Sequence, residues 1–230
     1  MLDADSALII AAHPDDEVLG CGGTMARLAQ KGCAVYVAIL GEGITSRFAQ
    51  REEADPAQLA SLHDRSRQAA EILGVKELFQ LDLPDNRFDT VPLLNVVKKI
   101  EELVETLRPE IVFTQHGGDL NVDHNVVYRA TLTATRPMAG CPVRSVYSYE
   151  VASSSEWAFS KFAPVFKPTV FADISATLDQ KIAAMAMYES EARPFPHPRS
   201  GRALRAIAER WGSTAGLEAA EAFELVRAIH

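Results

Sequence analysis

The chain has 230 residues, of which 47% are hydrophobic and 23% charged, and its net charge is −8. This length fits one large domain, residues 1–230, and no apolar stretch approaches the ~20 residues that a membrane-spanning helix needs. The acidic balance, without a cluster of lysine and arginine, disfavours nucleic acid as a partner, and the widely spaced, odd number of cysteines favours neither a disulfide framework nor a CxxC-type zinc site.

A buried strand that leads directly into a polar cluster is the first predicted element. The aliphatic run 7–10 has the length and branching of a strand in a parallel sheet, and His13-Pro14-Asp15-Asp16-Glu17 follows it. Open α/β sheets bind ligands at the carboxyl ends of their strands, so one imidazole and three carboxylates at this place indicate chemistry. The plainer alternative is that the carboxylates only cap the following helix.

Two of these side chains are candidate metal ligands. His13 and Asp16 provide a ring nitrogen and a carboxylate oxygen, which suit Zn²⁺ when a further ligand comes from elsewhere in the fold. Asp15 lies between them and is not needed as a ligand. We therefore predict that Asp15 is the general base, which takes the proton of the attacking water.

The next segments extend the pattern of strand, helix and loop. A helix that ends at Gly32 precedes the run 34–40, which predicts a second buried strand. The glycines of 20–23 do not form a GxGxxG sequence and lie beside the acidic cluster, which excludes a dinucleotide site. The polar segment 44–60 predicts an exposed, mobile loop that can serve as a lid, and the helix after it ends at Gly74.

A second polar cluster is predicted in the middle of the chain. The pattern there gives a strand over 77–81, a helix over 91–107 and a strand over 111–114. Polar residues fill the segment 115–124 at the exit of this last strand, and another helix follows. Because the carboxyl ends of parallel strands meet at one edge of a sheet, we expect this cluster beside the first.

The remaining third completes an α/β pattern. It predicts strands over 143–149 and 169–174, a helix over 178–188, a fixed proline-rich loop over 193–200, and a tail that is helical over 203–227 apart from 212–216. The fold class is therefore α/β: a Rossmann-like, mostly parallel sheet with helices on both faces.

The second cluster contains the best source of the missing metal ligand. His124 can donate a ring nitrogen, and Asp123 can orient a neighbouring group through a hydrogen bond. Two histidines, one aspartate and a water would make an open catalytic zinc site on His13, Asp16 and His124. A histidine that is only structural remains the alternative for His124 taken by itself.

These two motifs resemble a known family. The segments Ala12-His13-Pro14-Asp15-Asp16-Glu17 and Asn121-Val122-Asp123-His124 are similar to the LmbE/PIG-L family of zinc-dependent N-acetylglucosamine-type deacetylases, and the similarity covers nearly the whole chain. The resemblance implies Zn²⁺ on His13, Asp16 and His124, with Asp15 as general base. It also implies a small-molecule N-acetylated amino sugar or glycoconjugate as substrate, and a homo-oligomer that is often a hexamer.

The chain departs from the family at position 121. Many members have a histidine where this sequence has Asn121, which cannot act as a protonated acid but can still donate a hydrogen bond to an oxyanion. The proton for the leaving amine must then come from Asp15 or from another histidine. We expect His197 to take this part, because prolines hold its backbone and the loop resembles one near the site in bacterial members; a surface histidine is the alternative. His116 is a weaker candidate, and a core or supporting role is expected for it.

Three further residues are candidate substrate contacts. Arg47, Arg51 and Asp85 can contact hydroxyls or an anionic aglycone, although solvated loop charges are the commoner reason for such residues. The start of the chain, residues 1–5, has neither the basic nor the apolar region of a secretory signal, so the expected location is the cytoplasm.

Two classes of function follow from these motifs. The first is a metal-dependent amidohydrolase that removes the acetyl group from an N-acetylglucosamine-type sugar and releases acetate. The second is a non-catalytic, metal-containing protein that binds a sugar or nucleotide sugar on the same fold, an alternative prompted by Asn121. Asp15 favours the enzyme, because a binding protein has no need of a carboxylate beside the metal.

Overall fold

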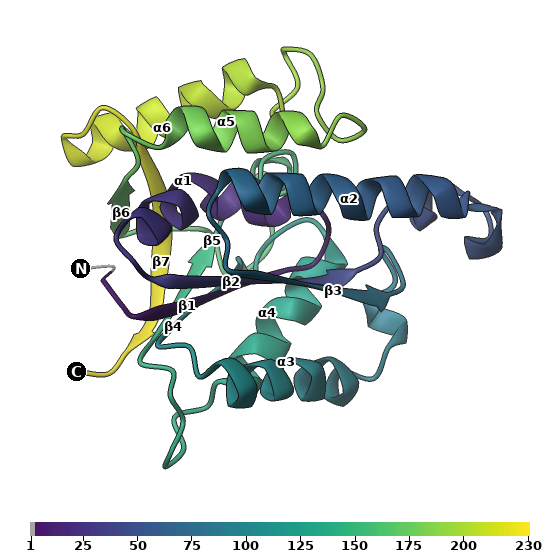
Figure 1. The fold of residues 1–230 in the computed structure, drawn as a ribbon, viewed down its shortest axis with the longest axis horizontal. Coiled ribbons are helices and arrows are strands. Elements are labelled where there is room, and N and C mark those ends of the chain that lie inside the picture. The colour runs from purple at the N-terminus through teal and green to yellow at the C-terminus, as the bar shows by residue number, and fades with distance from the viewer. Residues whose placement is uncertain (1–2) are drawn as a thin grey trace.

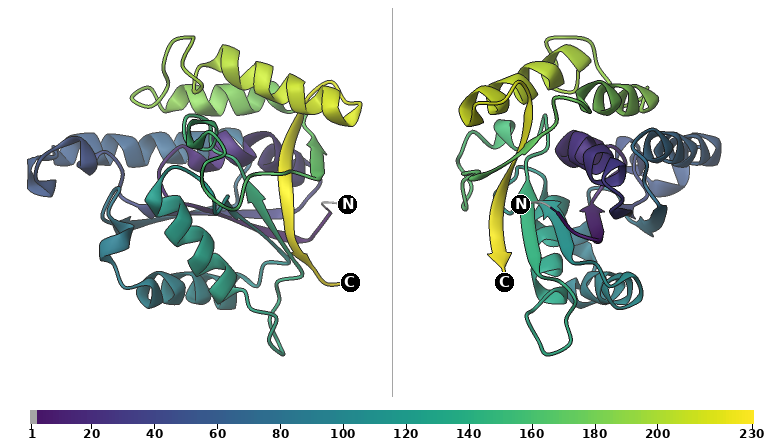
Figure 2. Two further views of the ribbon diagram at one scale, coloured as in Figure 1. Left: turned by 180° about the vertical axis from the view of Figure 1, so that it is seen from behind. Right: turned by 60° about the vertical axis from the view of Figure 1, so that its left-hand side comes forward.

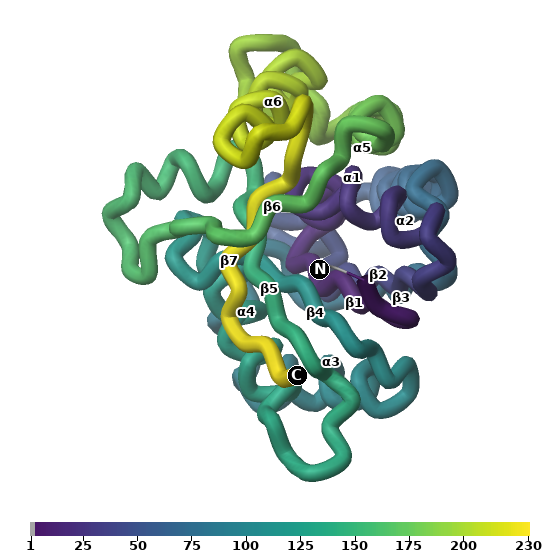
Figure 3. Tube along the Cα trace, turned by 90° about the vertical axis from the view of Figure 1, so that its left-hand side faces the viewer, coloured from purple at the N-terminus to yellow at the C-terminus, as the bar shows by residue number. Residues whose placement is uncertain are grey.

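One seven-stranded sheet, with strand order β3-β2-β1-β4-β5-β7-β6, runs through the molecule (Figures 1 and 3). The computed structural model describes residues 3–230; Met1 and Leu2, part of the start from which the cytoplasmic location is expected, lie outside the described residues. Strands β1 to β5 pair in parallel, and β7 pairs antiparallel with β5 and β6. The strands are β1 (Ser6–Ala11), β2 (Ala34–Gly41), β3 (Glu77–Leu83), β4 (Ile111–Gln115), β5 (Ser145–Tyr149), β6 (Val170–Asp173) and β7 (Ala220–Ala228).

Helices cover both faces of this sheet, as the sequence predicts. In Figures 1 and 2, α1, α2, α5 and α6 lie on one face, and α3 and α4 lie on the other. The helices are α1 (Asp16–Gln30), α2 (Pro56–Ile72), α3 (Leu93–Leu107), α4 (Val122–Ala134), α5 (Leu178–Met187) and α6 (Gly201–Ala215). The predicted α/β fold class is thereby confirmed.

Strand β1 is apolar without interruption because both of its faces are buried. Ile9 packs in the core on the α1 side, whereas Leu8 and Ile10 pack in the core that contains residues of α3. Successive side chains of a strand point to opposite faces, so a strand covered on both sides must be apolar at every position. The run 7–10 has this pattern because β1 lies in the middle of the sheet.

The order of the strands places a binding crevice beside β1. The chain builds β1, β2 and β3 outward in one direction and then continues with β4 on the other side of β1. The connections that leave β1 and β4 therefore diverge at their carboxyl ends, which is the switch point where open α/β sheets bind ligands. The two polar motifs follow β1 and β4.

The predicted helical tail is wrong beyond residue 216. Helix α6 continues through Ala215 and ends at Gly216, whose φ of +74° is readily adopted by glycine; the chain then forms β7 between β5 and β6. Gly212 lies within the helix, and the position suits glycine because a Cβ there would be 2.7 Å from the carbonyl oxygen of Leu217. Pairing with two strands, which a local pattern cannot reveal, overrides the helical spacing of the tail.

The predicted exposed loop is shorter than expected. Helix α2 begins at Pro56 rather than after Ala60, because the Asp55 carboxylate accepts a hydrogen bond from the Ala57 N–H at 2.8 Å and caps the helix. Two short 3₁₀ turns, Thr45–Arg47 and Arg51–Glu53, precede it. Across residues 3–230, no helix has both the length and the apolar character needed to cross a membrane.

Candidate metal centre and active site

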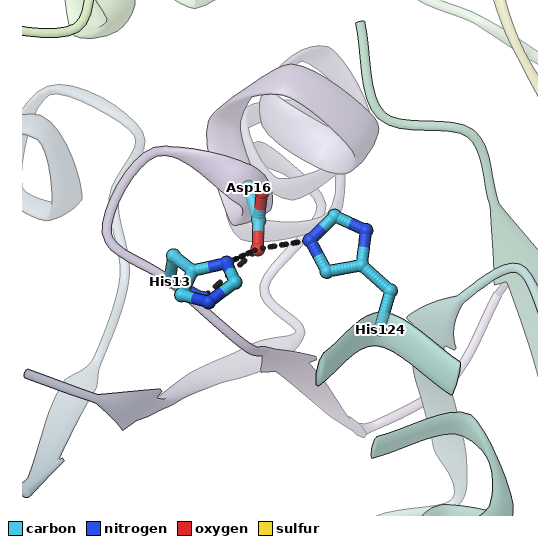
Figure 4. Close-up of side chains that lie close together, drawn as sticks. All are labelled: His13, Asp16 and His124. Carbon is cyan, nitrogen blue, oxygen red and sulfur yellow. Dashed lines mark hydrogen bonds and ion pairs between the residues drawn. The ribbon is translucent and has the colours of Figure 1, made fainter. Parts of the chain in front are cut away.

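The three predicted metal ligands converge on one point. His13 lies on the connection after β1, Asp16 opens α1, and His124 lies in the first turn of α4 (Figure 4). One carboxylate oxygen of Asp16, Oδ2, is 3.4 Å from His13 Nδ1 and 3.2 Å from His124 Nε2. All three donor atoms lie within 4.8 Å of one another.

This donor set fits a divalent metal ion. Ligand atoms at ~2.0–2.2 Å around a tetrahedral metal are roughly 3.3–3.6 Å apart, close to the spacing seen here. Both ring nitrogens of His124 are buried without an aligned hydrogen-bond partner, a costly arrangement that metal binding would relieve at Nε2. The amide of Gln115 at the end of β4 donates to Asp16 Oδ2 at 3.1 Å and fixes that oxygen.

A buried carboxylate supports each of the two imidazoles. Asp123 Oδ2 lies 2.9 Å from His13 Nε2, the ring nitrogen that faces away from Asp16, and Asp123 Oδ1 accepts the N–H of Phe88 at 2.9 Å. Asp119 Oδ1 lies 3.2 Å from His124 Nδ1. Such carboxylates fix the orientation of a metal-binding imidazole and raise its basicity.

Asp119 also belongs to the site, although the sequence alone predicts no role for it. The hydroxyl of Ser155 donates to Asp119 Oδ2 at 2.6 Å, the N–H of Asn121 donates to Asp119 Oδ1 at 2.9 Å, and Ser154 also donates to this carboxylate. The one feature of the sequence that could have pointed to Asp119 is its position five residues before His124, in the second polar cluster. The two serines come from the segment after β5, so their part in the site depends on the fold.

Asp15 is held in an unusual backbone conformation. Its φ is +103°, and its side chain is buried although it lies at the N-terminus of α1. Non-glycine residues held in rare regions of this kind cost of order 1–3 kcal/mol and persist where the surroundings fix them. Glu17 provides one such contact, because its Oε2 accepts the N–H of Asp15 at 3.1 Å while its Oε1 accepts the hydroxyl of Tyr188 at 2.5 Å.

The Asp15 carboxylate faces an arginine from the far end of the chain. Nη1 of Arg199 donates to Asp15 Oδ2 at 2.7 Å, and Nε of Arg199 donates to the Ser153 hydroxyl at 2.8 Å. Burial raises the pKa of Asp15 well above its usual value, and the charge of Arg199 opposes this rise. Asp15 is thus a carboxylate beside the candidate metal ligands that already has one cationic partner.

A small cavity of about 120 Å³ opens onto these groups. Asp15, Asp85, Asn121 and Arg47, four of the residues singled out in the sequence, line it together with His13. The Asp85 carboxylate accepts the Ser46 N–H at 3.0 Å and the Ser46 hydroxyl at 2.6 Å, and Asp85 Oδ1 lies 3.5 Å from His13 Nε2. The cavity therefore joins the two motifs to the loop after β2 and the turn after β3.

A model of the family described as PIG-L, GlcNAc-PI de-N-acetylase, matches residues 8–135. The chain belongs to the PIG-L family. The match contains both motifs and all three candidate metal ligands.

Two relatives of this PIG-L chain are named as deacetylases, and one solved structure of similar fold is named as a hydratase. It is 30% identical over 189 residues to the uncharacterized deacetylase YaiS of Escherichia coli (strain K12), with 80% of this chain and 90% of YaiS covered. It is 27% identical over 243 residues to diacetylchitobiose deacetylase of Thermococcus kodakarensis, with 99% and 85% covered. The crystal structure of GalB, the 4-carboxy-2-hydroxymuconate hydratase of Pseudomonas putida KT2440, has a TM-score of 0.79 at 22% identity and covers 99% of this chain and 98% of GalB. That likeness shows the fold alone.

The PIG-L match ends before the proline-rich loop, where the placement differs from expectation. His197 lies outside the cavity: its ring packs edge-on against Trp157, with centroids 5.5 Å apart, and its Nδ1 accepts the N–H of Arg199 at 3.1 Å. Arg199 lines the cavity instead. Partial burial and the nearby arginines lower the pKa of His197.

Two other predicted residues also lie outside the cavity. Arg51 pairs with the carboxylate of Glu42, with Nε–Oε1 and Nε–Oε2 distances of 2.9 Å. His116 is buried, and its Nε2 lies 2.7 Å from the carbonyl oxygen of Pro164, as expected for a structural histidine. Asn121, in contrast, reaches the cavity and caps α4, because its Oδ1 accepts the N–H of Asp123 at 2.9 Å.

Proposed function

We propose that this chain is a zinc-dependent hydrolase that removes the N-acetyl group from an N-acetylglucosamine-type amino sugar or its conjugate and releases acetate. One observation carries the proposal: the donor atoms of His13, Asp16 and His124 converge, and the buried carboxylate of Asp15, which is not among them, lines the same small cavity as His13. The two deacetylases among the named relatives support the same reaction.

The chain's own residues supply the other elements of such a hydrolysis. A zinc ion held by the three ligands would polarise the amide carbonyl and lower the pKa of water. Asp15 would take a proton from the attacking water as the C–O bond forms, and would return it to the nitrogen as the C–N bond breaks. The second proton of the water stays on the new carboxyl group, so the products are acetic acid and an amine. They separate as acetate and a protonated amine, and atoms and charge balance without another reactant.

Arg199 has a defined part in this proposal. Its guanidinium would hold the Asp15 carboxylate in place and favour its ionised form, because the two groups are 2.7 Å apart in a largely buried pair. Protonated Asp15 would lose this charge pairing, which favours passing the proton on to the leaving amine. Arg199 thus acts through Asp15 as a positioning residue.

The oxyanion needs a hydrogen-bond donor besides the metal. Asn121 lines the cavity, and its amide nitrogen donates one hydrogen bond, to Asn86 Oδ1 at 2.9 Å, which leaves its second hydrogen for a substrate. His197, the donor expected from the sequence, would have to turn away from Trp157 to reach the same place. Both assignments stay predictions, and substitutions separate them.

Acetate release tests the proposed reaction. The zinc-loaded protein is incubated with N-acetylglucosamine and with diacetylchitobiose, and acetate and free amine are each measured. We expect equal amounts of both products, and their loss in Asp15→Asn. Tight sugar binding without acetate would instead support the non-catalytic alternative. A separate incubation contains 4-carboxy-2-hydroxymuconate. Its hydration, with no acetate released from the sugars, would support the reaction named for GalB.

Other expectations from the sequence belong to this proposal as well. We keep the cytoplasm as the expected location and a homo-oligomer, up to a hexamer, as the expected assembly. The proposed substrate remains a small molecule. Native mass spectrometry of the purified chain tests the assembly.

A further inference from the structure

A second cleft continues the cavity away from the metal ligands. It has a volume of about 440 Å³, against about 120 Å³ for the catalytic cavity. Ile44, Arg47 and Leu62 line both, so the two spaces adjoin along these residues. A sugar whose acetamido group reaches the ligands would therefore have the outer cleft available for whatever is attached to it.

The arginines of this outer cleft are already paired with glutamates. Arg47 Nη2 lies 2.5 Å from Glu191 Oε1, and Arg65 Nη2 lies 3.1 Å from Glu189 Oε2. Arg199, at the inner end, pairs with Asp15 and lies 3.5 Å from the other oxygen of Glu191. Each cation that lines either space thus has a carboxylate partner within 4 Å among the described residues.

These pairs make the cleft unfavourable for an anion. A carboxylate or phosphate that approached Arg47 would meet the charge of Glu191, whose side chain is only 12% exposed and therefore incompletely screened. Like charges brought together at a binding surface reject the wrong partner. The cleft offers paired charges, not a free positive site.

The other lining groups suit a neutral, hydroxylated ring. Gln58, Ser61 and Ser190 supply side-chain donors and acceptors, and the methyl groups of Leu62 and Ile44 supply apolar surface. The carboxylates and guanidinium groups of the two ion pairs also have hydrogen-bonding capacity left over. A ring with hydroxyls on its edge and C–H bonds on its face matches both kinds of group.

We infer that the outer cleft binds the aglycone of the substrate, and that this aglycone is a neutral hydroxyl-bearing ring, such as a second sugar or a cyclic polyol, rather than a carboxylate or phosphate. The inference rests on the proposed function. It narrows the substrate class to N-acetylglucosamine conjugates with a neutral aglycone. When such a conjugate binds, Arg47 and Arg65 remain paired with Glu191 and Glu189.

The preferred charge of the aglycone can be tested with two substrates that have the same α-linked sugar and differ only in the aglycone. The zinc-loaded protein is given N-acetyl-α-D-glucosaminyl myo-inositol and N-acetyl-α-D-glucosaminyl L-malate, and kcat/KM is measured for each and for free N-acetylglucosamine. We expect the inositol conjugate to exceed the malate conjugate by at least ~10-fold, a ratio that corresponds to about 1.4 kcal/mol. We also expect it to exceed the free sugar.

Glutamate variants test the cause of this preference. Glu191→Gln leaves Arg47 without its partner, so the ratio of inositol to malate activity should fall about tenfold. The ratio cancels any common loss of kcat, which matters because Glu191 lines the catalytic cavity. Glu189→Gln, at an exposed position, should shift the ratio in the same direction by less. Glu71→Gln, which removes an equal charge from the exposed face of α2, should leave the ratio unchanged.

Each alternative result has a definite meaning. A wild-type preference for malate, or a ratio that Glu191→Gln does not move, would overturn the inference, and so would equal activity on free N-acetylglucosamine. No acetate from any of the three would count against the proposed function instead. Calorimetric affinities of the zinc-loaded protein for the two conjugates would still rank the aglycones in that case, and tighter binding of malate would overturn the inference.

Discussion

Arg199 and Asp15 are joined by a 2.7 Å ion pair although 184 residues separate them in the chain. The pair connects the proline-rich loop before α6 to the residue that precedes α1, so the segment outside the PIG-L match completes the environment of the candidate base. The hydroxyl of Ser153, which has a φ of +72°, holds the guanidinium from the other side. This arrangement makes the environment of Asp15 a property of the whole fold.

Substitution of Arg199 should lower catalysis without removing the metal. We expect Arg199→Met to reduce kcat by ~10–100-fold, less than the loss of a general base at ~10²–10⁴-fold, because Asp15 loses its orienting partner but stays in place. Arg199→Lys should restore part of kcat, since it keeps the charge. Arg202→Met, an exposed site on the same segment, serves as control, and zinc content measured by mass spectrometry should be unchanged in all three variants. Zinc loss in Arg199→Met would contradict a positioning role.

Substitutions of the adjacent residues Asp15 and Asp16 should have different effects on zinc binding and on kcat. Asp15→Asn should keep zinc and lose at least ~100-fold in kcat, because an amide cannot accept the proton of water. Asp16→Asn should lower zinc occupancy, since Asp16 Oδ2 lies near a nitrogen of both histidines. Metal analysis and single-substrate kinetics on the same preparations decide the question. If both variants lose zinc equally, the division of roles is mistaken.

Removal of the metal should be reversible and should depend on His13. A chelator should abolish acetate release, and one equivalent of zinc per chain should restore it, because the three-ligand site leaves one position open. His13→Ala should bind much less zinc than the wild type. Unchanged zinc content in that variant would place the metal elsewhere.

The carboxylates behind the imidazoles should tune metal affinity. Asp119→Asn should weaken zinc binding by ~10–100-fold, as expected for a group that orients a metal-binding histidine. Its fully buried counterpart Asp123→Asn should have a comparable effect through His13. Competition with a chelating dye measures both affinities. An unchanged affinity in Asp119→Asn would mean that the contact with His124 is only structural.

The sequence predicted those parts of the structure that are coded locally. The apolar run before His13 reveals β1 because a strand buried on both faces has no polar position, and the fold class follows from repetition of that pattern. The candidate ligands could be found because His13 and Asp16 are three residues apart and because His124 follows β4, the strand that lies beside β1 in the sheet. In each case the signal lies within a few residues of the element that it defines.

Residues whose position depends on tertiary structure could not be predicted in this way. Arg199 lies in a loop where His197 is the more conspicuous residue, and only the folded chain brings its guanidinium, not the imidazole, to Asp15. The segment of β7 contains alanine, leucine and valine at spacings that suit a helix, yet its place between β5 and β6 decides its conformation. Long-range pairing leaves little trace in a single sequence.

We expect Asn121, rather than His197, to supply the hydrogen-bond donor for the oxyanion. Asn121 lines the cavity, whereas His197 packs on Trp157 outside it, so we expect loss of the Asn121 amide to lower kcat by roughly 10²–10³-fold, which corresponds to ~2.7–4 kcal/mol. Asn121→Ser is the suitable variant, because serine retains an oxygen that can cap α4 through the Asp123 N–H while the amide donor is lost.

His197→Ala should lower kcat by no more than about tenfold, through the loop that carries Arg199. Zinc content and thermal unfolding of both variants should match the wild type. The converse pattern, an active Asn121→Ser with a nearly inactive His197→Ala, would return the role to His197 and would require its imidazole to turn into the cavity during the reaction.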